Sequence, residues 1–436
     1  MSFRSVVKAF IPDRLFRQIE PYGHLTEAVL FNIIYGFPAR GLKVIGVTGT
    51  NGKTSTCFLI HRMMVEAGYS VGLMTTVGYG VGDDIKPQIQ HMTNVSVPQL
   101  MRRLKQMKRA GAEWLVLETT SHALSQHRVW GIPYSVAVMT NVTHEHLDYH
   151  GTFENYLGAK RQLFKLTSRN KKGLQLGVIN AEDPSAKLFG EDITRPLTYG
   201  IKAGEIRASN IKATSSGSDF MVKSQRHKDL VLKIHVNLPG SFNVYNVLAA
   251  VSVGFALQME PRQIEKGIAA LKSVEGRMVA IDGGQDFSVV VDYAHTPDSF
   301  EKLFKDLKPA SQGKLIVMFG SAGGQRDPAK RPIQGKIAGR YADEVILTEE
   351  DDRDTPGMEI LNEIATGVQK AGKLRDKDLF LVHDRTEAIK FTLGRASAGD
   401  TVLLLGKGHE KTIERADGEH PWDEVAIVKA ALKQPK

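Results

Sequence analysis

The chain has 436 residues, of which 42% are hydrophobic and 24% are charged, and its formal net charge is +9. This length and composition predict two or three folded domains and exclude a disordered or low-complexity chain. The single cysteine, Cys57, excludes an intrachain disulfide and favours a cytoplasmic protein. No nucleic-acid-binding motif accompanies the positive charge, so we expect small anionic substrates as partners and no nucleic acid.

The N-terminal segment lacks the features of a membrane span or a secretion signal. No apolar run reaches the roughly 20 residues that a span needs. Asp13, Arg14, Arg17 and Glu20 interrupt the region where a signal peptide would be apolar. The first twenty residues can form a basic amphipathic helix that touches a membrane surface, but we favour a helix that packs on its own protein. We therefore expect an N-terminal helical segment over 1–40, no firm membrane contact and a monomer.

Buried strands alternate with helices from Lys43 onward. Strands are expected at Lys43–Val47, Trp114–Leu117, Ser135–Met139 and Val178–Ile179. Helices are expected at Thr54–Ala67, Pro98–Ala110 and Phe153–Thr167. This alternation predicts a parallel sheet covered by helices. Polar residues gather where the strands end, and open α/β sheets bind their ligands at that edge.

The second half of the chain repeats this alternation after a different stretch. Short alternating runs between Arg207 and Val236 predict a small antiparallel insertion, and a helix is expected at Asn246–Leu257. Further strands are expected at Ser288–Val291, Leu315–Phe319, Glu344–Leu347, Leu379–Val382 and Thr401–Leu405. The fold class is therefore α/β, with a central P-loop parallel-sheet domain over 41–274 and a C-terminal Rossmann-like domain over 275–436.

A glycine-rich loop connects the first strand to the first helix of this alternation. It consists of Gly49, Thr50, Asn51, Gly52, Lys53, Thr54 and Ser55. Glycines let backbone amides approach phosphate, and the helix N-terminus adds a positive dipole. Lys53 would neutralise phosphate charge, and the Thr54 hydroxyl would bind Mg²⁺. Val47 stands where the usual spacing has glycine, but the strand–loop–helix context still predicts a nucleoside triphosphate site.

Five motifs in order resemble the Mur ligase family, closest to its MurE type. The string GVTGTNGKT is shared with folylpolyglutamate synthetases, whereas the other four are similar to MurE-type motifs. Those four are ETTSHALSQHR from Glu118, TNVTHEHLDYHG with the later Tyr156 and Lys160, DYAHTP from Asp292, and GKGHE from Gly406. The resemblance implies an ATP-dependent ligase of peptidoglycan synthesis that activates a carboxylate as an acyl phosphate and adds an amino acid to a UDP-muramoyl dipeptide.

The resemblance also implies ATP and two Mg²⁺ ions at the phosphate loop. The implied metal ligands are Thr54, Glu118, His146 and Lys160, and Lys53 completes the catalytic set. A bare lysine repels Mg²⁺, and the resemblance implies that CO₂ converts Lys160 into an anionic carbamate that binds the second ion. Further ATP contacts are implied at Asn243, Arg277, Asp292 and His295, the last two only if the C-terminal domain closes over the nucleotide.

The resemblance implies two substrate-binding regions. Contacts with the nucleotide-linked muropeptide are implied at Thr93, Asn94, Thr120, Gln126 and Arg128. Val95 replaces the family's proline beside them, and Thr120 replaces a serine. In diaminopimelate enzymes a D-N-P-R loop reads the amino acid, and this chain has Glu350-Asp351-Asp352-Arg353 there.

This replacement leaves the amino acid open. Arg353 is expected to fork onto the distal carboxylate of meso-diaminopimelate, and Asp351 and Glu410 would receive its distal ammonium. Arg331 and Gly406 complete the expected substrate site. Lysine, ornithine and other diamines stay open as alternatives.

Two other functions also stay open. A folylpolyglutamate-synthetase-like ligase would share the phosphate loop and the carbamylated lysine, but the H-A-L…Q-H-R and G-K-G-H-E motifs oppose it. A nucleotide-binding scaffold without ligase activity is opposed by the intact Lys53, Glu118, His146 and Lys160. Typical Mur ligases carry an α/β uridine-binding domain first, and the residues before Lys43 are too few for one.

Overall fold

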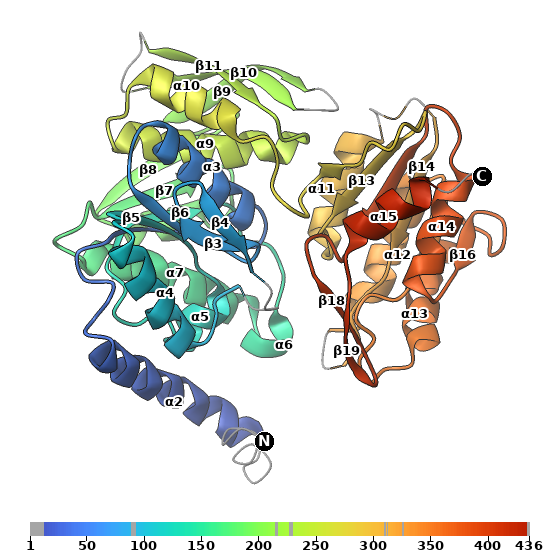
Figure 1. The fold of residues 1–436 in the computed structure, drawn as a ribbon, viewed down its shortest axis with the longest axis horizontal. Helices are drawn as coiled ribbons and strands as arrows, with labels where there is room; N and C mark the ends of the chain where they lie inside the picture. The colour runs from blue at the N-terminus through green and yellow to red at the C-terminus, as the bar shows by residue number, and fades with distance from the viewer. Residues whose placement is uncertain are drawn as a thin grey trace.

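The computed structural model describes residues 13–88, 93–213, 217–225, 230–308, 311, 313–324 and 327–433. Figure 1 shows two lobes, each built on its own sheet, with helix α2 (Asp13–Ile34) projecting from the first lobe. Each sheet is covered by helices on both faces, and each face has its own cluster of buried apolar side chains. This architecture confirms the α/β fold class.

The first sheet is centred on the strand that precedes the phosphate loop. Strand β1 (Lys43–Thr48) pairs in parallel with β5 (Trp114–Glu118) on one side and β6 (Tyr134–Met139) on the other. Beyond these lie β2 (Val71–Met74) and β7 (Leu176–Asn180), also parallel. All five strands are nearly continuous apolar runs, as expected for strands that helices cover on both faces.

Helices cover both faces of this sheet. One face carries α3 (Lys53–Glu66), α9 (Ser241–Ala256) and α10 (Pro261–Ala270). The other face carries α4 (Val97–Arg109), α5 (Ser121–Ser125) and α7 (Phe153–Arg169). The short helices α6 (Leu147–His150) and α8 (Ala186–Glu191) lie before and after α7.

The expected antiparallel insertion extends the main sheet instead of forming a separate unit. Strand β8 (Arg195–Gly200) pairs in parallel with β9 (Ile206–Ala213), and β10 (Ser218–Ser224) and β11 (Val231–Val236) follow antiparallel. At the opposite edge, β3 (Gly78–Val81) and β4 (Asp84–Pro87) were not predicted. The sheet thus has eleven strands among the residues described.

Helix α9 begins at Ser241, five residues before the predicted start at Asn246. Asn243 and Asn246 are buried there, and Asn246 Nδ2 donates to Asn243 Oδ1 at 2.8 Å. Because a hydrogen bond offsets the cost of burying an amide, the helix accommodates both asparagines on one face.

The second sheet has the order β12-β13-β17-β14-β15-β16, and only β12 (Val279–Ala280) is antiparallel to its neighbour. The parallel strands are β13 (Ser288–Asp292), β17 (Thr401–Leu405), β14 (Leu315–Phe319), β15 (Glu344–Leu347) and β16 (Leu379–Leu381). Its helices are α11 (Pro297–Leu307), α12 (Lys330–Tyr341), α13 (Gly357–Lys370), α14 (Arg385–Arg395) and α15 (Glu424–Leu432). A hairpin of β18 (Thr412–Arg415) and β19 (Gly418–Pro421) follows β17.

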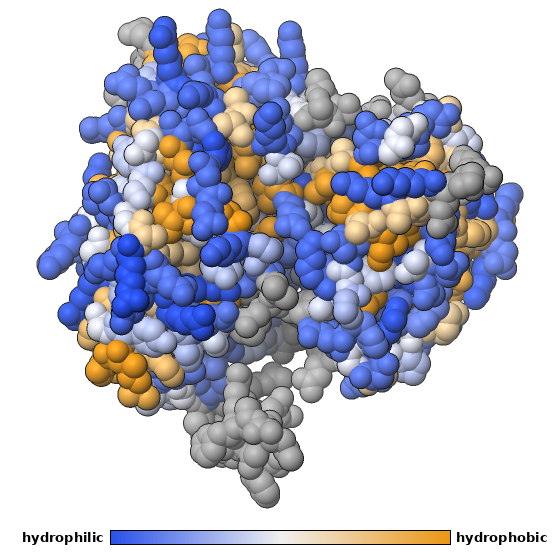
Figure 2. All heavy atoms as spheres, in the orientation of Figure 1, coloured by the Kyte–Doolittle hydropathy of each residue, from blue (hydrophilic) through white to orange (hydrophobic). Residues whose placement is uncertain are grey.

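Helix α2 packs on α4 through one face and exposes apolar side chains on another. Ala28 and Asn32 are fully buried, whereas Leu30, Ile33 and Ile34 are more than half exposed. Figure 2 shows hydrophobic residues gathered over this C-terminal end of α2. The helix therefore packs on its own protein through Ala28 and Asn32, whereas the expected packing of the first twenty residues falls almost wholly outside the described residues. Among the residues described, no helix has the length and apolar character to cross a membrane.

Candidate active site

Two glycines let the phosphate loop approach its neighbours closely. Gly52 caps α3 in a left-handed conformation at φ 83°. A side chain at Gly52 would overlap the Asn246 amide, and one at Gly49 would overlap the Thr140 hydroxyl. The glycines therefore bring backbone amides to the N-terminus of α3, where a phosphate binds favourably.

The end of β6 braces the same loop. Thr50 N donates to Asn141 O at 2.8 Å, and Asn51 N donates to Asn141 Oδ1 at 2.9 Å. Lys53 Nζ lies over the loop and donates to Thr50 O at 2.8 Å. The predicted phosphate-binding residues are thus held together at the carboxyl edge of the sheet.

Glu118 ends the neighbouring strand β5 and is buried with an exposed fraction of 2%. Its carboxylate accepts hydrogen bonds from Thr54 Oγ1 at 3.0 and 3.2 Å. It also accepts from Thr76 N at 3.0 Å and from Thr76 Oγ1 at 3.1 Å. These partners are neutral and leave the carboxylate's charge to be offset by a cation. Thr54 and Glu118 form the oxygen pair that Mg²⁺ prefers.

Lys160 comes from α7 and lies on the other side of the phosphate loop, 2% exposed. Its Nζ donates to Gly49 O at 2.6 Å and lies 4.4 Å from the centre of the Tyr156 ring. Burial holds the pKa of Lys160 well below its usual value, and the nearby Lys53 lowers it further, although Glu145 opposes the shift. The low pKa favours the neutral amine, which is the form that reacts with CO₂.

His146 precedes α6 in a left-handed conformation at φ 56°. Its ring lies 4.7 Å from His122 and 6.2 Å from Tyr156, centre to centre. The neighbouring Glu145 is largely buried, which raises its pKa, but His146 and His295 lower that pKa below the usual range on balance. The structure places the Glu145 carboxylate 3.9 Å from Nε2 of the histidine that was predicted to bind metal.

The residues predicted to bind the muropeptide converge beside Glu118. Asn94 Oδ1 accepts from Thr120 N at 3.0 Å and from Thr120 Oγ1 at 2.8 Å. Arg128 Nη1 donates to Asn94 O at 2.5 Å, and Thr93 Oγ1 accepts from Thr76 at 2.8 Å. Gln126, also buried, caps α5 in the same region.

A cavity of about 880 Å³ lies between the two lobes, next to the phosphate loop. The predicted ATP-binding residues that line it are Asn51, Gly52, Ser55, Asn243, Arg277, Asp292 and His295. The cavity is also lined by residues that no sequence motif had indicated, namely Glu182, Asp183, Phe242, Tyr245 and Lys302. The residues from both domains therefore face one nucleotide-sized space.

Arg277 and Asp292 organise the C-terminal wall of this cavity. Arg277 lies over the Tyr293 ring at 4.7 Å and donates to Thr54 Oγ1 at 3.4 Å. Asp292 accepts from the backbone N–H groups of Met278 and Ala294, both at 2.7 Å. Burial raises the pKa of Asp292, and the charge of Arg277 opposes that rise.

Further polar contacts join the lobes around the cavity. Asn51 Nδ2 donates to Asp298 Oδ2 at 2.7 Å, and His295 Nε2 lies 3.6 Å from Glu145 Oε1. Ser241 N donates to the Asp306 carboxylate at 2.6 Å. Asn51 and His295 were expected at the nucleotide, and Glu145 lies within the histidine-rich stretch after β6, whereas Asp298, Ser241 and Asp306 had no sequence signal. The lobes are thus closed together, which is what Asp292 and His295 need to reach the nucleotide.

A second group of charged residues lies at the carboxyl edge of the second sheet. Lys407 is fully buried, and its Nζ lies 2.8 Å from Asp351 Oδ1 and 2.6 Å from Glu410 Oε2. An ammonium of the substrate would therefore share both carboxylates with Lys407. At Gly406, which has φ 104°, a side chain would meet the Glu350 carboxylate.

Arg353 and Arg331 occupy different surroundings. Arg353 pairs with Glu414 of the hairpin and lines a cavity of about 540 Å³ together with Asp354, Arg415 and Glu419. Arg331 is 3% exposed and is held by Glu363 at 2.8 Å and by Ala322 O at 3.0 Å. Arg353 faces a ligand-sized space, whereas Arg331 supports the loop after β14.

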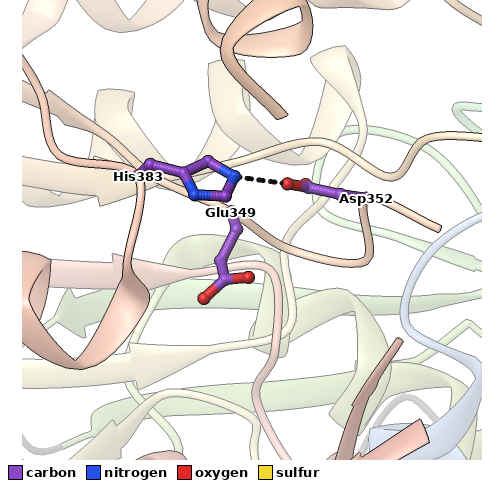
Figure 3. Close-up of side chains that lie close together, drawn as sticks. All are labelled: Glu349, Asp352 and His383. Carbon is purple, nitrogen blue, oxygen red and sulfur yellow. Dashed lines mark hydrogen bonds and ion pairs between the residues drawn. The ribbon is translucent and has the colours of Figure 1, made fainter. Parts of the chain in front are cut away.

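A compact cluster behind the loop after β15 consists of Glu349, Asp352 and His383 (Figure 3). His383 Nε2 lies 2.7 Å from Asp352 Oδ2, and Figure 3 shows the Glu349 carboxylate turned away from that pair. Arg415 holds Glu349 at 2.7 and 2.9 Å, and Arg385 N donates to it at 3.2 Å. Since protein groups already offset these charges, the cluster braces the loop before Arg353.

Comparison with known proteins agrees with this geometry. Residues 47–254 match the Mur ligase middle domain, and residues 276–408 match the Mur ligase glutamate ligase domain. A UDP-N-acetylmuramyl-tripeptide synthetase from Roseiflexus sp. (strain RS-1) is 40% identical over 429 residues, covering 95% of this chain and 83% of that protein. The chain belongs to the Mur ligase family. It is similar throughout to the MurE-type ligases of that family.

Other relatives support the same placement. A UDP-N-acetylmuramoyl-L-alanyl-D-glutamate–2,6-diaminopimelate ligase from Geobacillus thermodenitrificans (strain NG80-2) is 38% identical, covering 95% of this chain and 84% of the relative. A solved ligase of the same description superimposes with a TM-score of 0.62 at 30% identity, covering 95% and 82%. A Mycobacterium tuberculosis folylpolyglutamate synthase complexed with ADP reaches a TM-score of 0.72 at 16% identity, covering 97% and 98%. That last likeness shows a shared fold alone.

Proposed function

We propose that this Mur ligase activates the carboxylate of a UDP-muramoyl-dipeptide-like acceptor as an acyl phosphate and joins it to an amino acid in peptidoglycan synthesis. The observation that carries the proposal is the flanking of one phosphate loop by buried Glu118 and buried Lys160, whose pKa is lowered by burial. Enzymes of this family use ATP and Mg²⁺. Thr54, Glu118 and His146 supply the donors that suit Mg²⁺, which would neutralise the approach of two anions.

The protein's own residues account for the other requirements of the reaction. Lys53 and the amides at the start of α3 bind and orient the triphosphate. Arg128, which lies beside Thr120 and Asn94, would bind an anionic group of the acceptor. The closed lobes exclude water, which would otherwise hydrolyse an acyl phosphate before the amine attacks it.

The second metal site of the proposal depends on Lys160. A neutral Lys160 amine would attack CO₂, forming an N–C bond while one C=O electron pair moves onto oxygen, and the released proton would pass to water, which leaves an anionic carbamate. The depressed pKa supports this step, because only the unprotonated amine has the electron pair that it needs. The carbamate would turn the buried amine into an anionic ligand for the second Mg²⁺.

The incoming amino acid of the proposal is meso-diaminopimelate. Arg353 lines a cavity at the carboxyl edge of the second sheet, and its guanidinium suits a distal carboxylate. A monomeric, cytoplasmic enzyme divided into 1–40, 41–274 and 275–436 remains part of the proposal.

The test is ADP release by the purified full chain with Mg²⁺. UDP-muramoyl-L-alanyl-D-glutamate is supplied with meso-diaminopimelate, lysine or ornithine, and each reaction is repeated without acceptor and without amino acid. We expect ADP release that needs both substrates, with diaminopimelate used best. Release with a folate and glutamate instead would move the enzyme to the folylpolyglutamate synthetases. The absence of turnover with every pair would leave a nucleotide-binding scaffold.

A further inference from the structure

Arg353 stands in a backbone conformation that its surroundings must hold. Its φ is 55°, in the left-handed region that residues other than glycine rarely adopt. Glu414 of the hairpin makes two contacts with it. Arg353 N donates to Glu414 O at 3.2 Å, and Arg353 Nε pairs with the Glu414 carboxylate. The loop after β15 and the hairpin are thus fastened to each other at this pair.

The ion pair uses only one edge of the guanidinium. Nε faces Glu414, and among the residues that the structure describes neither Nη1 nor Nη2 of Arg353 has a partner. The Arg353 side chain remains 29% exposed and lines the cavity of about 540 Å³. Since a guanidinium grips a carboxylate through parallel N–H groups, the remaining edge suits a carboxylate of the ligand.

Glu414 is itself anchored in the buried part of the lobe. Glu414 N donates to Asp351 Oδ1 at 2.8 Å, and Asp351 Oδ1 also accepts from the fully buried Lys407 at 2.8 Å. On the opposite side, a side chain at Gly324 would lie 3.1 Å from Arg353 Cδ. The Arg353 side chain therefore lies between the carboxylate of Glu414, whose backbone is anchored by Asp351, and Gly324, which leaves it room.

We propose that Glu414 is a positioning residue that aims Arg353 at the distal carboxylate of the incoming amino acid. The inference rests on the proposed function, in which Arg353 reads that carboxylate. Holding a long, flexible side chain in its bound geometry lowers the entropy cost of binding. Glu414 thereby selects diamino dicarboxylic acids over diamines without touching either.

The test measures steady-state kinetics of the full chain with meso-diaminopimelate, and with lysine as a substrate or competitive inhibitor. We expect Glu414→Ala to raise the KM for diaminopimelate about tenfold, the scale of a lost hydrogen bond to a charged group. The kcat and the KM for ATP should stay unchanged, and so should the apparent affinity for lysine. Glu414→Gln keeps an acceptor for Nε and should recover most of the loss.

A double-mutant cycle and a matched control complete the test. Because Glu414 acts through Arg353, Glu414→Ala should add almost nothing in an Arg353→Ala background. Asp417→Asn removes an exposed carboxylate from the same hairpin, paired with His420 rather than Arg353, and should change neither KM. An Arg353→Ala variant with unchanged kinetics would refute the proposal that Arg353 binds the distal carboxylate of the amino acid. A normal Glu414→Ala variant, or one that affects lysine equally, would overturn the inference while leaving Arg353 in place.

Discussion

At the phosphate loop, Glu118 and Lys160 are buried and hydrogen-bonded to neutral groups. At the carboxyl edge of the second sheet, by contrast, the buried charged side chains form ion pairs with one another. Lys407 there lies between Asp351 and Glu410, and Arg385 is held by Glu424. Burying an uncompensated charge is costly, so such a site is completed by its ligands. A site whose buried charges already form ion pairs needs no ligand to offset them, and it recognises its ligand through the orientation of its side chains.

The largest expected effect comes from the phosphate loop, where Lys160 is buried without an ion pair among the residues that the structure describes. Lys160→Ala should lose nearly all ligase activity, and high bicarbonate should not restore it, because no amine remains to carry the carbamate. Short carboxylic acids should restore part of the activity by supplying an anion in the vacated space. Steady-state ADP release with each additive measures this effect. Turnover like that of the unchanged enzyme would show that the lysine is dispensable.

Removal of the carboxylate on the other side of the loop should come next. Glu118→Ala should lower turnover at least about a hundredfold, the usual scale for an electrostatic catalytic group. Thr54→Ala should act in the same direction, because its hydroxyl donates to Glu118. Titrations of Mg²⁺ against ADP release would locate the loss in metal handling. Unchanged nucleotide affinity together with unchanged turnover would refute the metal assignment.

At the carboxyl edge of the second sheet, we expect a substitution to change mainly the KM for the amino acid. Breaking an arginine–carboxylate contact costs roughly 2–5 kcal/mol, so Arg353→Ala should raise the KM for diaminopimelate tens- to thousands-fold. The KM for ATP should change little, since Arg353 lies outside the nucleotide cavity. Equal use of lysine and diaminopimelate by the unchanged enzyme would show that the loop reads no distal carboxylate.

The smallest effect concerns stability and acid pH. His61 lies behind the phosphate loop in α3, and burial lowers its pKa from 6.5 to about 4. The unfolded chain therefore takes up a proton as the pH falls through 6.5, while the folded chain does so only near 4. His61→Leu should remove about 2 kcal/mol of the stability lost between pH 7 and pH 5.

Thermal unfolding of the unchanged protein and of His61→Leu, at pH 7 and at pH 5, measures this difference in stability. His235 is exposed, and its hydrogen bond to Asp219 raises its pKa, so His235→Leu should act with the opposite sign. An unfolding temperature of His61→Leu that falls as steeply with pH as that of the unchanged protein would contradict the assignment.

The sequence by itself predicted the α/β class, the strand before the phosphate loop and its parallel neighbours, because apolar runs and glycine positions depend on local physical chemistry. It missed β3 and β4, which have only four residues each, and it began α9 at Asn246. The buried Asn243 and Asn246 are hydrogen-bonded to each other within the first turns of the folded helix.

For the site, residue type and motif order nominated the residues that the phosphate loop and the interlobe cavity bring together. Only the tertiary structure decided which charges are already paired. It placed Lys407 between Asp351 and Glu410, Glu414 against Arg353, and Lys160 beside Gly49. Apart from the contact between Lys407 and Glu410, these contacts join segments far apart in the chain. Ion pairing and desolvation depend on distances in space, which sequence spacing does not fix.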